Sequence, residues 1–276
     1  MKGCGINRNF FPLSAISKDL ILEARAVLVQ IKEAVDEDLE RQKSFVQTDY
    51  AELIKIKERI YELSNRYYQL IPLSKYTFAM PMPLRNYHEI QEQYETLQQL
   101  TNIEFASKIL LGAKQRQYEM NPIDYVHQAL NLMIEPLDKA GGEYEVINKY
   151  IQNTNTNFRH RIKNIFKIQR KGEAEVMQTF KDLPNHYLLY HGSSIFNFIG
   201  ILAQGLRIAP PEAPPTGYMF GKGVYFADMF DKSAPYANRG NFKQSSFLML
   251  LCEVALGNQK ELHNAQYIDK LEGEFQ

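Results

Sequence analysis

The segment Tyr190-His191-Gly192-Ser193 places a histidine directly after a short apolar run, YLLY at 187–190. An imidazole can donate or accept a hydrogen bond near neutral pH. Glycine at position 192 lets the backbone approach a flat ligand, with its N–H and C=O available to a primary carboxamide such as that of nicotinamide. A histidine that simply packs at the end of a strand gives the same pattern. Both interpretations stay open on these residues alone.

The stretch PPTGYMFGKGVYFAD at 214–228 is rich in glycine, proline and aromatic residues, as phosphate-binding loops often are. Gly221 and Gly223 have the spacing of the first two glycines of a dinucleotide fingerprint, but Phe226 stands where the third glycine is needed. A Walker loop needs four residues between its glycines, and only three separate Gly217 from Gly221. Neither phosphate-loop interpretation holds, and a loop with hairpin turns is the structural alternative.

Three side chains near this stretch could complete a site for a flat amide. Tyr225 and Tyr236 offer ring faces for stacking, and Ser233 offers a hydroxyl to the amide. Each has a structural alternative: Tyr225 as a residue of a strand core, Tyr236 as a helix-packing residue and Ser233 as a helix cap.

The elements that position these residues differ between the two halves of the chain. In the first half, apolar residues recur at spacings of three and four from Ser17, which is placed to cap the helix, and again from Leu53 to Tyr67. Further helices are predicted at about 87–100, 102–111 and 143–152, and one begins at Asn121-Pro122. This pattern predicts a helical bundle.

After residue 155, short apolar runs alternate with turn residues and predict strands. The predicted strands are 165–168, 187–190, 223–227 and 246–256, with short helices at about 194–204 and 229–238. We therefore expect an α+β chain with a helical domain over 1–155 and a mixed domain over 156–276.

Composition excludes several classes of protein. The 276 residues contain 32 Lys plus Arg and 32 Asp plus Glu, so no overall field favours nucleic acid or membrane. The one basic stretch, 159–171, is best interpreted as a surface strand or loop with solvated cations. Cys4 and Cys252 are too few for a metal cluster or a disulfide framework. Since no apolar run or N-terminal segment suits a membrane span or a secretory signal, we expect an intracellular protein.

The order of these motifs resembles the catalytic domain of poly(ADP-ribose) polymerases, nearest the DNA-dependent nuclear members. The resemblance rests on YHGS at 190–193, GILAQGLRIAPPEAPPTGYMFGKGVYFADMFDKSAPYA at 200–237 and LLCEVALGN at 250–258. LSNRYYQLIP at 63–72, the NPID turn at 121–124 and KYIQNT at 149–154 are similar to the family's helical regulatory domain. The resemblance implies a helical regulatory domain followed by an ADP-ribosyltransferase domain, the first restraining the NAD site of the second.

The resemblance also assigns the residues of the nicotinamide pocket. His191 matches the family histidine that hydrogen-bonds the adenine ribose, and Gly192 the residue whose backbone holds the carboxamide. Ser233 matches the hydroxyl on the same amide, and Tyr236 the ring that stacks on nicotinamide. Tyr225 matches the tyrosine of the family's His-Tyr-Glu triad, so His191 and Tyr225 are the expected catalytic pair.

Other matched positions lie on the adenosine and diphosphate side of NAD. They are Ser193, Asn197 and Arg207. The loop 210–221 matches the family's donor-site loop, with Tyr218 as a contact to NAD. No metal is implied.

Members of this family use NAD as a substrate, cleave its nicotinamide–ribose bond and transfer ADP-ribose to a protein side chain or a growing polymer. Because the leaving group is already a cationic pyridinium, catalysis is largely positioning and electrostatics. The family's triad glutamate lies on a strand later than LLCEVALGN. We therefore expect a chain that is incomplete at both ends, and surface roles for its own late carboxylates: Glu253, Glu261, Glu272 and Glu274.

The sequence leaves two functions open. The first is an NAD-dependent protein ADP-ribosyltransferase, with acceptor proteins as partners (the enzyme itself included), a nuclear location and a DNA-damage response through modules outside this chain. The second is a non-catalytic fragment, either an NAD-binding pseudoenzyme or a helical interaction module. A dehydrogenase is disfavoured, because the third glycine and a βαβ unit are missing.

Overall fold

The computed structural model describes residues 16–43, 50–73, 82–156, 160–208, 219–237, 246–268 and 270–271. The chain divides into two compact units, one of residues 1–107 with 209–217 and the other of 108–208 with 218–276. The predicted division into domains at residue 155 stays a prediction.

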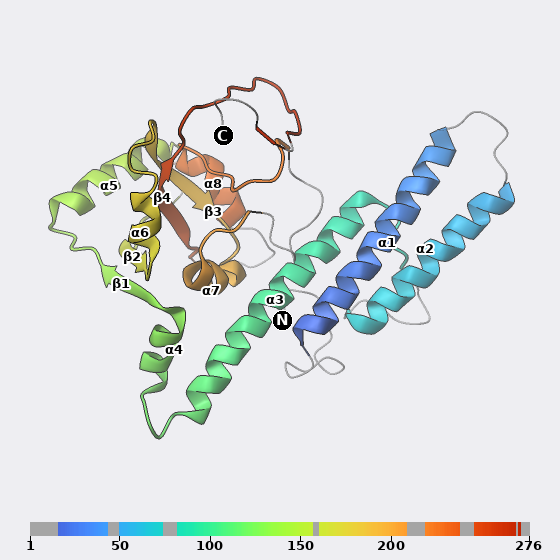
Figure 1. The fold of residues 1–276 in the computed structure, drawn as a ribbon, viewed down its shortest axis with the longest axis horizontal. Helices are drawn as coiled ribbons and strands as arrows, with labels where there is room; N and C mark the ends of the chain where they lie inside the picture. The colour runs from blue at the N-terminus through green and yellow to red at the C-terminus, as the bar shows by residue number, and fades with distance from the viewer. Residues whose placement is uncertain are drawn as a thin grey trace. The chain divides into compact units, whose positions relative to one another are not determined.

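The first unit is helical (Figure 1). Its helices are α1 (Lys18–Lys43), α2 (Tyr50–Leu70) and the larger part of α3 (Tyr87–Gln115). The predicted cap is present, since the Leu20 amide donates to Ser17 Oγ at 3.2 Å. The two helices predicted at 87–100 and 102–111 are one continuous helix, because neither glycine nor proline interrupts the sequence between them.

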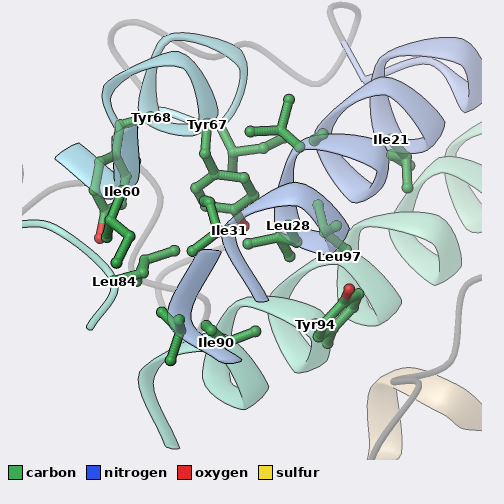
Figure 2. Packing of buried hydrophobic residues seen from close by; sticks show 14 of the residues in the cluster. Ile21, Leu28, Ile31, Ile60, Tyr67, Tyr68, Leu84, Ile90, Tyr94 and Leu97 are labelled. Atoms are coloured by element: carbon green, nitrogen blue, oxygen red, sulfur yellow. The ribbon is translucent and has the colours of Figure 1, made fainter. Parts of the chain in front are cut away.

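The predicted apolar faces of these helices form one core. Figure 2 shows side chains of α1, α2 and α3 pointing toward one another, with Leu28 and Ile31 of α1 near Tyr67 of α2 and Leu97 of α3. Leu28, Ile31 and Tyr67 are fully buried. Burial of this apolar face, rather than helix propensity, provides most of the stability of such a bundle.

The second unit mixes helices with short strands, which confirms the predicted α+β class. Its elements are α4 (Pro122–Leu130), β1 (Leu132–Pro136), α5 (Gly142–Thr154), β2 (Phe166–Arg170), α6 (Glu173–Gln178), β3 (His186–Gly192), α7 (Ile195–Gln204), α8 (Phe230–Ala237) and β4 (Met249–Ala255). The described strands form two antiparallel pairs, β1 with β2 and β3 with β4. Helix α8 lies beside β3 and β4 (Figure 1).

Two details of the second unit differ from the sequence prediction. Residues 223–227 do not form a strand; only Ala227 pairs with a strand, through one bridge to Tyr190. The reason is local, since the Tyr225 hydroxyl donates to the Gly221 carbonyl at 2.7 Å and closes a turn that an extended strand would open. Strand β1 was not predicted, and neither was helix α6, whose six residues are too few to show a helical period.

Within the described ranges, no helix is both long and apolar enough to cross a membrane. The same residues contain no group of three His, Cys, Asp or Glu side chains that could hold a metal ion. Cys252 is half-buried on β4, and burial raises the pKa of its thiol to about 11, so the thiol is unreactive at neutral pH.

Candidate functional site at the end of strand β3

His191 lies at the end of β3 and is fixed by the backbone of a distant segment. Its Nδ1 is 2.9 Å from the Tyr225 carbonyl oxygen. Because a carbonyl can only accept, Nδ1 carries the hydrogen and Nε2 is the acceptor of the neutral ring. Burial lowers the pKa of His191 below its ordinary 6.5, although the Tyr225 carbonyl opposes this shift. At neutral pH, His191 is therefore a neutral side chain whose Nε2 can accept a hydroxyl hydrogen.

Gly192 is required where β3 meets helix α8. A Cβ atom added at this position would lie 2.0 Å from the Ser233 carbonyl oxygen and 3.1 Å from the Ala237 nitrogen. Only glycine lets the two backbones come this close. The strand end and the helix that carries Ser233 and Tyr236 are thus held in direct contact.

Ser233 and Tyr236 lie on α8 in different surroundings. Ser233 is 5% exposed, and its Oγ donates to the Tyr190 carbonyl at 3.1 Å. Tyr236 is 43% exposed, so much of its surface can be covered by a ligand. The predicted role of Ser233 as a partner of an amide requires its lone pairs, since its hydrogen is given to β3.

Tyr225 is held beside β3 by the backbone that follows it. The Tyr190 amide donates to the Ala227 carbonyl at 2.7 Å, and the Ala227 amide donates to the Tyr190 carbonyl at 3.0 Å. The Tyr225 ring is 43% exposed, and its hydroxyl accepts from the Phe220 amide at 3.3 Å. The expected catalytic pair, His191 and Tyr225, is therefore brought together by main-chain bonds.

The residues predicted for the adenosine side lie at the start of α7 and beyond it. Asn197 Nδ2 donates to Ser193 Oγ at 2.8 Å, so these two side chains form one polar pair. Arg207 is exposed, just after the end of α7. Residues 210–218 of the predicted donor-site loop, Tyr218 among them, lie outside the described residues.

The two described late carboxylates, Glu253 and Glu261, are not brought to His191. Glu253 lies opposite Leu188 on β4, and its Oε1 is 3.0 Å from His186 Nδ1 at the far end of β3. Glu261 is exposed after β4. The other two, Glu272 and Glu274, lie outside the described residues.

A groove of about 610 Å³ lies elsewhere in this unit, among α4, β1, β2 and α6. Its lining includes His127, Asn131, Arg170 and Glu175. It contains none of the predicted site residues, so the groove is separate from the end of β3.

Sequence reasoning missed one group of residues that supports the site. Tyr150 and Thr154 of α5 hydrogen-bond to β3, and the Tyr150 ring stacks on that of Tyr190. The available signal was the spacing, since residues four apart share one face of a helix. That signal identifies a buried face but not its partner.

The sequence matches two family models, described as the poly(ADP-ribose) polymerase regulatory domain, over residues 1–127, and the poly(ADP-ribose) polymerase catalytic domain, over residues 141–275. It is 42% identical over 266 residues to poly [ADP-ribose] polymerase 1 of Danio rerio and 41% identical to that of Gallus gallus, covering 94% of this chain and 24% of each relative. It is 37% identical to poly [ADP-ribose] polymerase 2 of Arabidopsis thaliana, over 97% of this chain and 40% of the relative. The chain thus spans about a quarter of the first two relatives and less than half of the third.

Proposed function

The chain belongs to the poly(ADP-ribose) polymerase family, and from this premise we propose that it binds NAD at the end of β3 and transfers ADP-ribose from it to protein acceptors. The observation that carries the proposal is the junction at His191 and Gly192. There one strand end is joined to the Tyr225 segment by a hydrogen bond and to α8 by close backbone approach.

The residue roles follow from this junction and from the family match. The Gly192 backbone and the Ser233 hydroxyl hold the carboxamide of nicotinamide, while Tyr236 and Tyr225 supply ring surface on either side of it. His191 accepts a hydrogen bond from a hydroxyl of the adenine ribose. Its Nε2 is available for this because the neutral ring carries its hydrogen on Nδ1.

The adenosine and diphosphate groups are assigned to the surface that begins at α7. Ser193 and Asn197 are already paired there, and Arg207 follows the end of α7 in the sequence. An arginine suits a diphosphate because its guanidinium pairs with two oxygens at once. Tyr218 completes the proposed NAD contacts from the donor-site loop.

The proposed reaction breaks the bond between C1′ of the nicotinamide ribose and the ring nitrogen. The electron pair stays on the nitrogen and neutralises the pyridinium, and an acceptor oxygen forms the new bond to C1′. A hydroxyl acceptor also releases a proton, whereas a carboxylate acceptor does not. Holding NAD at its adenine ribose, through His191, and at its nicotinamide ring, through Gly192 and Tyr225, is how these residues would lower the barrier.

The test uses NAD carrying separate labels on nicotinamide and on adenine, incubated with the chain and a protein acceptor. The proposal predicts release of nicotinamide and incorporation of the adenine label into protein. Binding without release would instead indicate the non-catalytic alternative. Absence of both binding and release would contradict the proposal for this chain.

We further propose a polymeric product, a nuclear location and activation by DNA damage, as the family resemblance implies. A ladder of products on a denaturing gel would support polymer formation, and a single shifted band would indicate transfer of one unit. Imaging of the tagged natural protein before and after DNA damage tests the other two points.

A further inference from the structure

Helix α5 contacts both backbone segments of the site through one side chain. The Tyr150 hydroxyl is 2.7 Å from the Leu188 carbonyl oxygen on β3 and 3.3 Å from the Asp228 carbonyl oxygen. Leu188 precedes His191 by three residues, and Asp228 follows Tyr225 by three. A single hydroxyl hydrogen is thus directed between two carbonyls, one on the strand that carries His191 and one on the segment that carries Tyr225. We call these two backbone segments the arms of the site.

The position of this hydroxyl is explained by the edge of β3. Neighbouring residues of a strand direct their backbone groups to opposite edges, so Leu188 and Tyr190 face the same edge. Tyr190 is paired there with Ala227, whereas the next residue of that segment, Asp228, no longer pairs with the strand. The Tyr150 hydroxyl takes the place of a backbone donor at the point where the two segments separate.

Packing fixes the Tyr150 ring in this place. The ring stacks on that of Tyr190, with centroids 5.3 Å apart and planes inclined by 7°. Tyr190 is 1% exposed, and its hydroxyl is 2.9 Å from Thr154 Oγ. Thr154 gives its own hydrogen to the Tyr150 carbonyl at 2.9 Å, so the Tyr190 hydroxyl must be the donor of that pair.

We propose that Tyr150 is a positioning residue that sets the distance between the strand carrying His191 and Gly192 and the segment carrying Tyr225. This inference rests on the proposed function, because it assigns the nicotinamide end of NAD to the space between those two arms. The adenosine end is assigned to His191, Ser193 and Asn197, which all lie on the first of these two segments, at the end of β3 and after it. A change in the distance between the segments should therefore weaken recognition of nicotinamide, which lies between them, and spare that of ADP-ribose.

The experiment compares three variants of the 276-residue chain. Tyr150→Phe removes the hydroxyl and keeps the stacked ring. Tyr144→Phe removes a hydroxyl from the same helix, and among the described residues Tyr144 makes no hydrogen bond. Thr154→Val removes the hydrogen-bond acceptor of the Tyr190 hydroxyl without removing a donor from the Leu188 or Asp228 carbonyl. The probes are benzamide, which carries the ring and carboxamide of nicotinamide, and ADP-ribose, which lacks them.

Two quantities are measured for each variant: the affinity for each probe, and the hydrogen exchange of the Tyr190 and Ala227 amides that form the bridge. We expect Tyr150→Phe to weaken benzamide about fivefold, the effect of one hydrogen bond, while ADP-ribose stays within about twofold. The rate of hydrogen exchange at the Tyr190 and Ala227 amides should rise in Tyr150→Phe. Tyr144→Phe should match the parent chain, and Thr154→Val should leave the ratio of the two affinities unchanged.

Equal weakening of both probes in Tyr150→Phe, or unchanged exchange at the bridge, would overturn the inference. The parent chain could bind neither probe while Tyr150→Phe still exchanges the Tyr190 and Ala227 amides faster than the parent. That result would overturn the proposed function but support the positioning of the two segments by Tyr150. The two hypotheses therefore fail by different results.

Discussion

Two histidines on strand β3 have opposite electrostatic surroundings. His191 is half-buried, and this desolvation lowers its pKa, whereas the pKa of His186 is raised chiefly by its hydrogen bond to Glu253. The pKa values of the two imidazoles therefore shift in opposite directions because of what each side chain contacts.

NAD affinity should depend on the protonation of His191. Since its pKa lies below 6.5, the ring is neutral above that pH and its Nε2 can accept a hydroxyl hydrogen. We expect affinity to be constant from about pH 7 to 8 and to fall as the pH drops through the lowered pKa of His191, below 6.5. Nuclear magnetic resonance titration of the imidazoles and calorimetric titration with NAD measure both effects.

His186→Gln is the control for this prediction, because it removes the exposed histidine of the same strand. It should leave the pH dependence of NAD binding unchanged. A His191 ring that titrates above pH 6.5, or a decline in affinity that disappears in His186→Gln, would contradict the assignment.

The close approach at Gly192 gives a second prediction at the residue scale. Gly192→Ala places a methyl group 2.0 Å from the Ser233 carbonyl oxygen, so the strand end and α8 must separate. Overpacking of this kind costs about 1–3 kcal/mol of unfolding free energy, and benzamide binding should be lost with it. Denaturant unfolding and a binding titration measure the two effects.

Gly142→Ala is the matched control, since no atom lies within 4 Å of its added Cβ. It sits in the first turn of α5 and should be neutral or slightly stabilising. If both variants lost the same stability, the steric explanation for Gly192 would be wrong.

At the scale of elements, a buried serine joins α2 to the segment before α3. Ser64 Oγ donates to the Ile60 carbonyl at 2.7 Å and accepts from the Leu84 amide at 3.0 Å. Ser64→Ala leaves that buried amide without its acceptor, at a cost of about 1–3 kcal/mol in unfolding free energy. Thermal and denaturant unfolding provide the measurement.

Thr96→Ala tests whether the cost comes from burial. Thr96 Oγ also donates to a carbonyl of its own helix, at 3.0 Å, but this hydrogen bond is exposed to solvent. Its loss should change stability by no more than about 0.5 kcal/mol. A larger loss for Thr96→Ala than for Ser64→Ala would contradict the role of Ser64.

Sequence periodicity predicted the long helices because their apolar faces repeat over many turns. The start of α4 was predicted from Asn121 and Pro122, and Asn121 Oδ1 does accept from the Ile123 amide at 2.9 Å. The run at 223–227 was predicted wrongly as a strand, because its apolar residues bend into a turn closed by the Tyr225 hydroxyl. Sequence pattern alone does not show a contact of this kind.

The candidate site was predictable in part. The order of His191, Gly192, Tyr225 and Ser233 suggested one pocket, and the structure joins these residues by hydrogen bonds and close approach. The contribution of Tyr150 was not predictable, because its partners are two backbone carbonyls far away in the sequence. Periodicity identifies a face of a helix, but it does not identify main-chain partners on other elements.

At the scale of the whole molecule, the chain forms two units with separate cores. We therefore expect two unfolding transitions in calorimetry. NAD at about 100 times its dissociation constant should stabilise the unit it binds by about 2.7 kcal/mol, and so raise only one of the two melting temperatures. A single transition that moves as a whole with NAD would contradict independent unfolding of the units.

The central claim is that NAD binds where β3 meets α8 and the Tyr225 segment. The most direct test is hydrogen exchange across the whole chain, with and without saturating NAD. We predict slower exchange at residues 190–193, 225–227 and 233–237, and unchanged exchange along the groove lined by His127 and Arg170. Protection confined to that groove, or no protection at the end of β3, would contradict the claim.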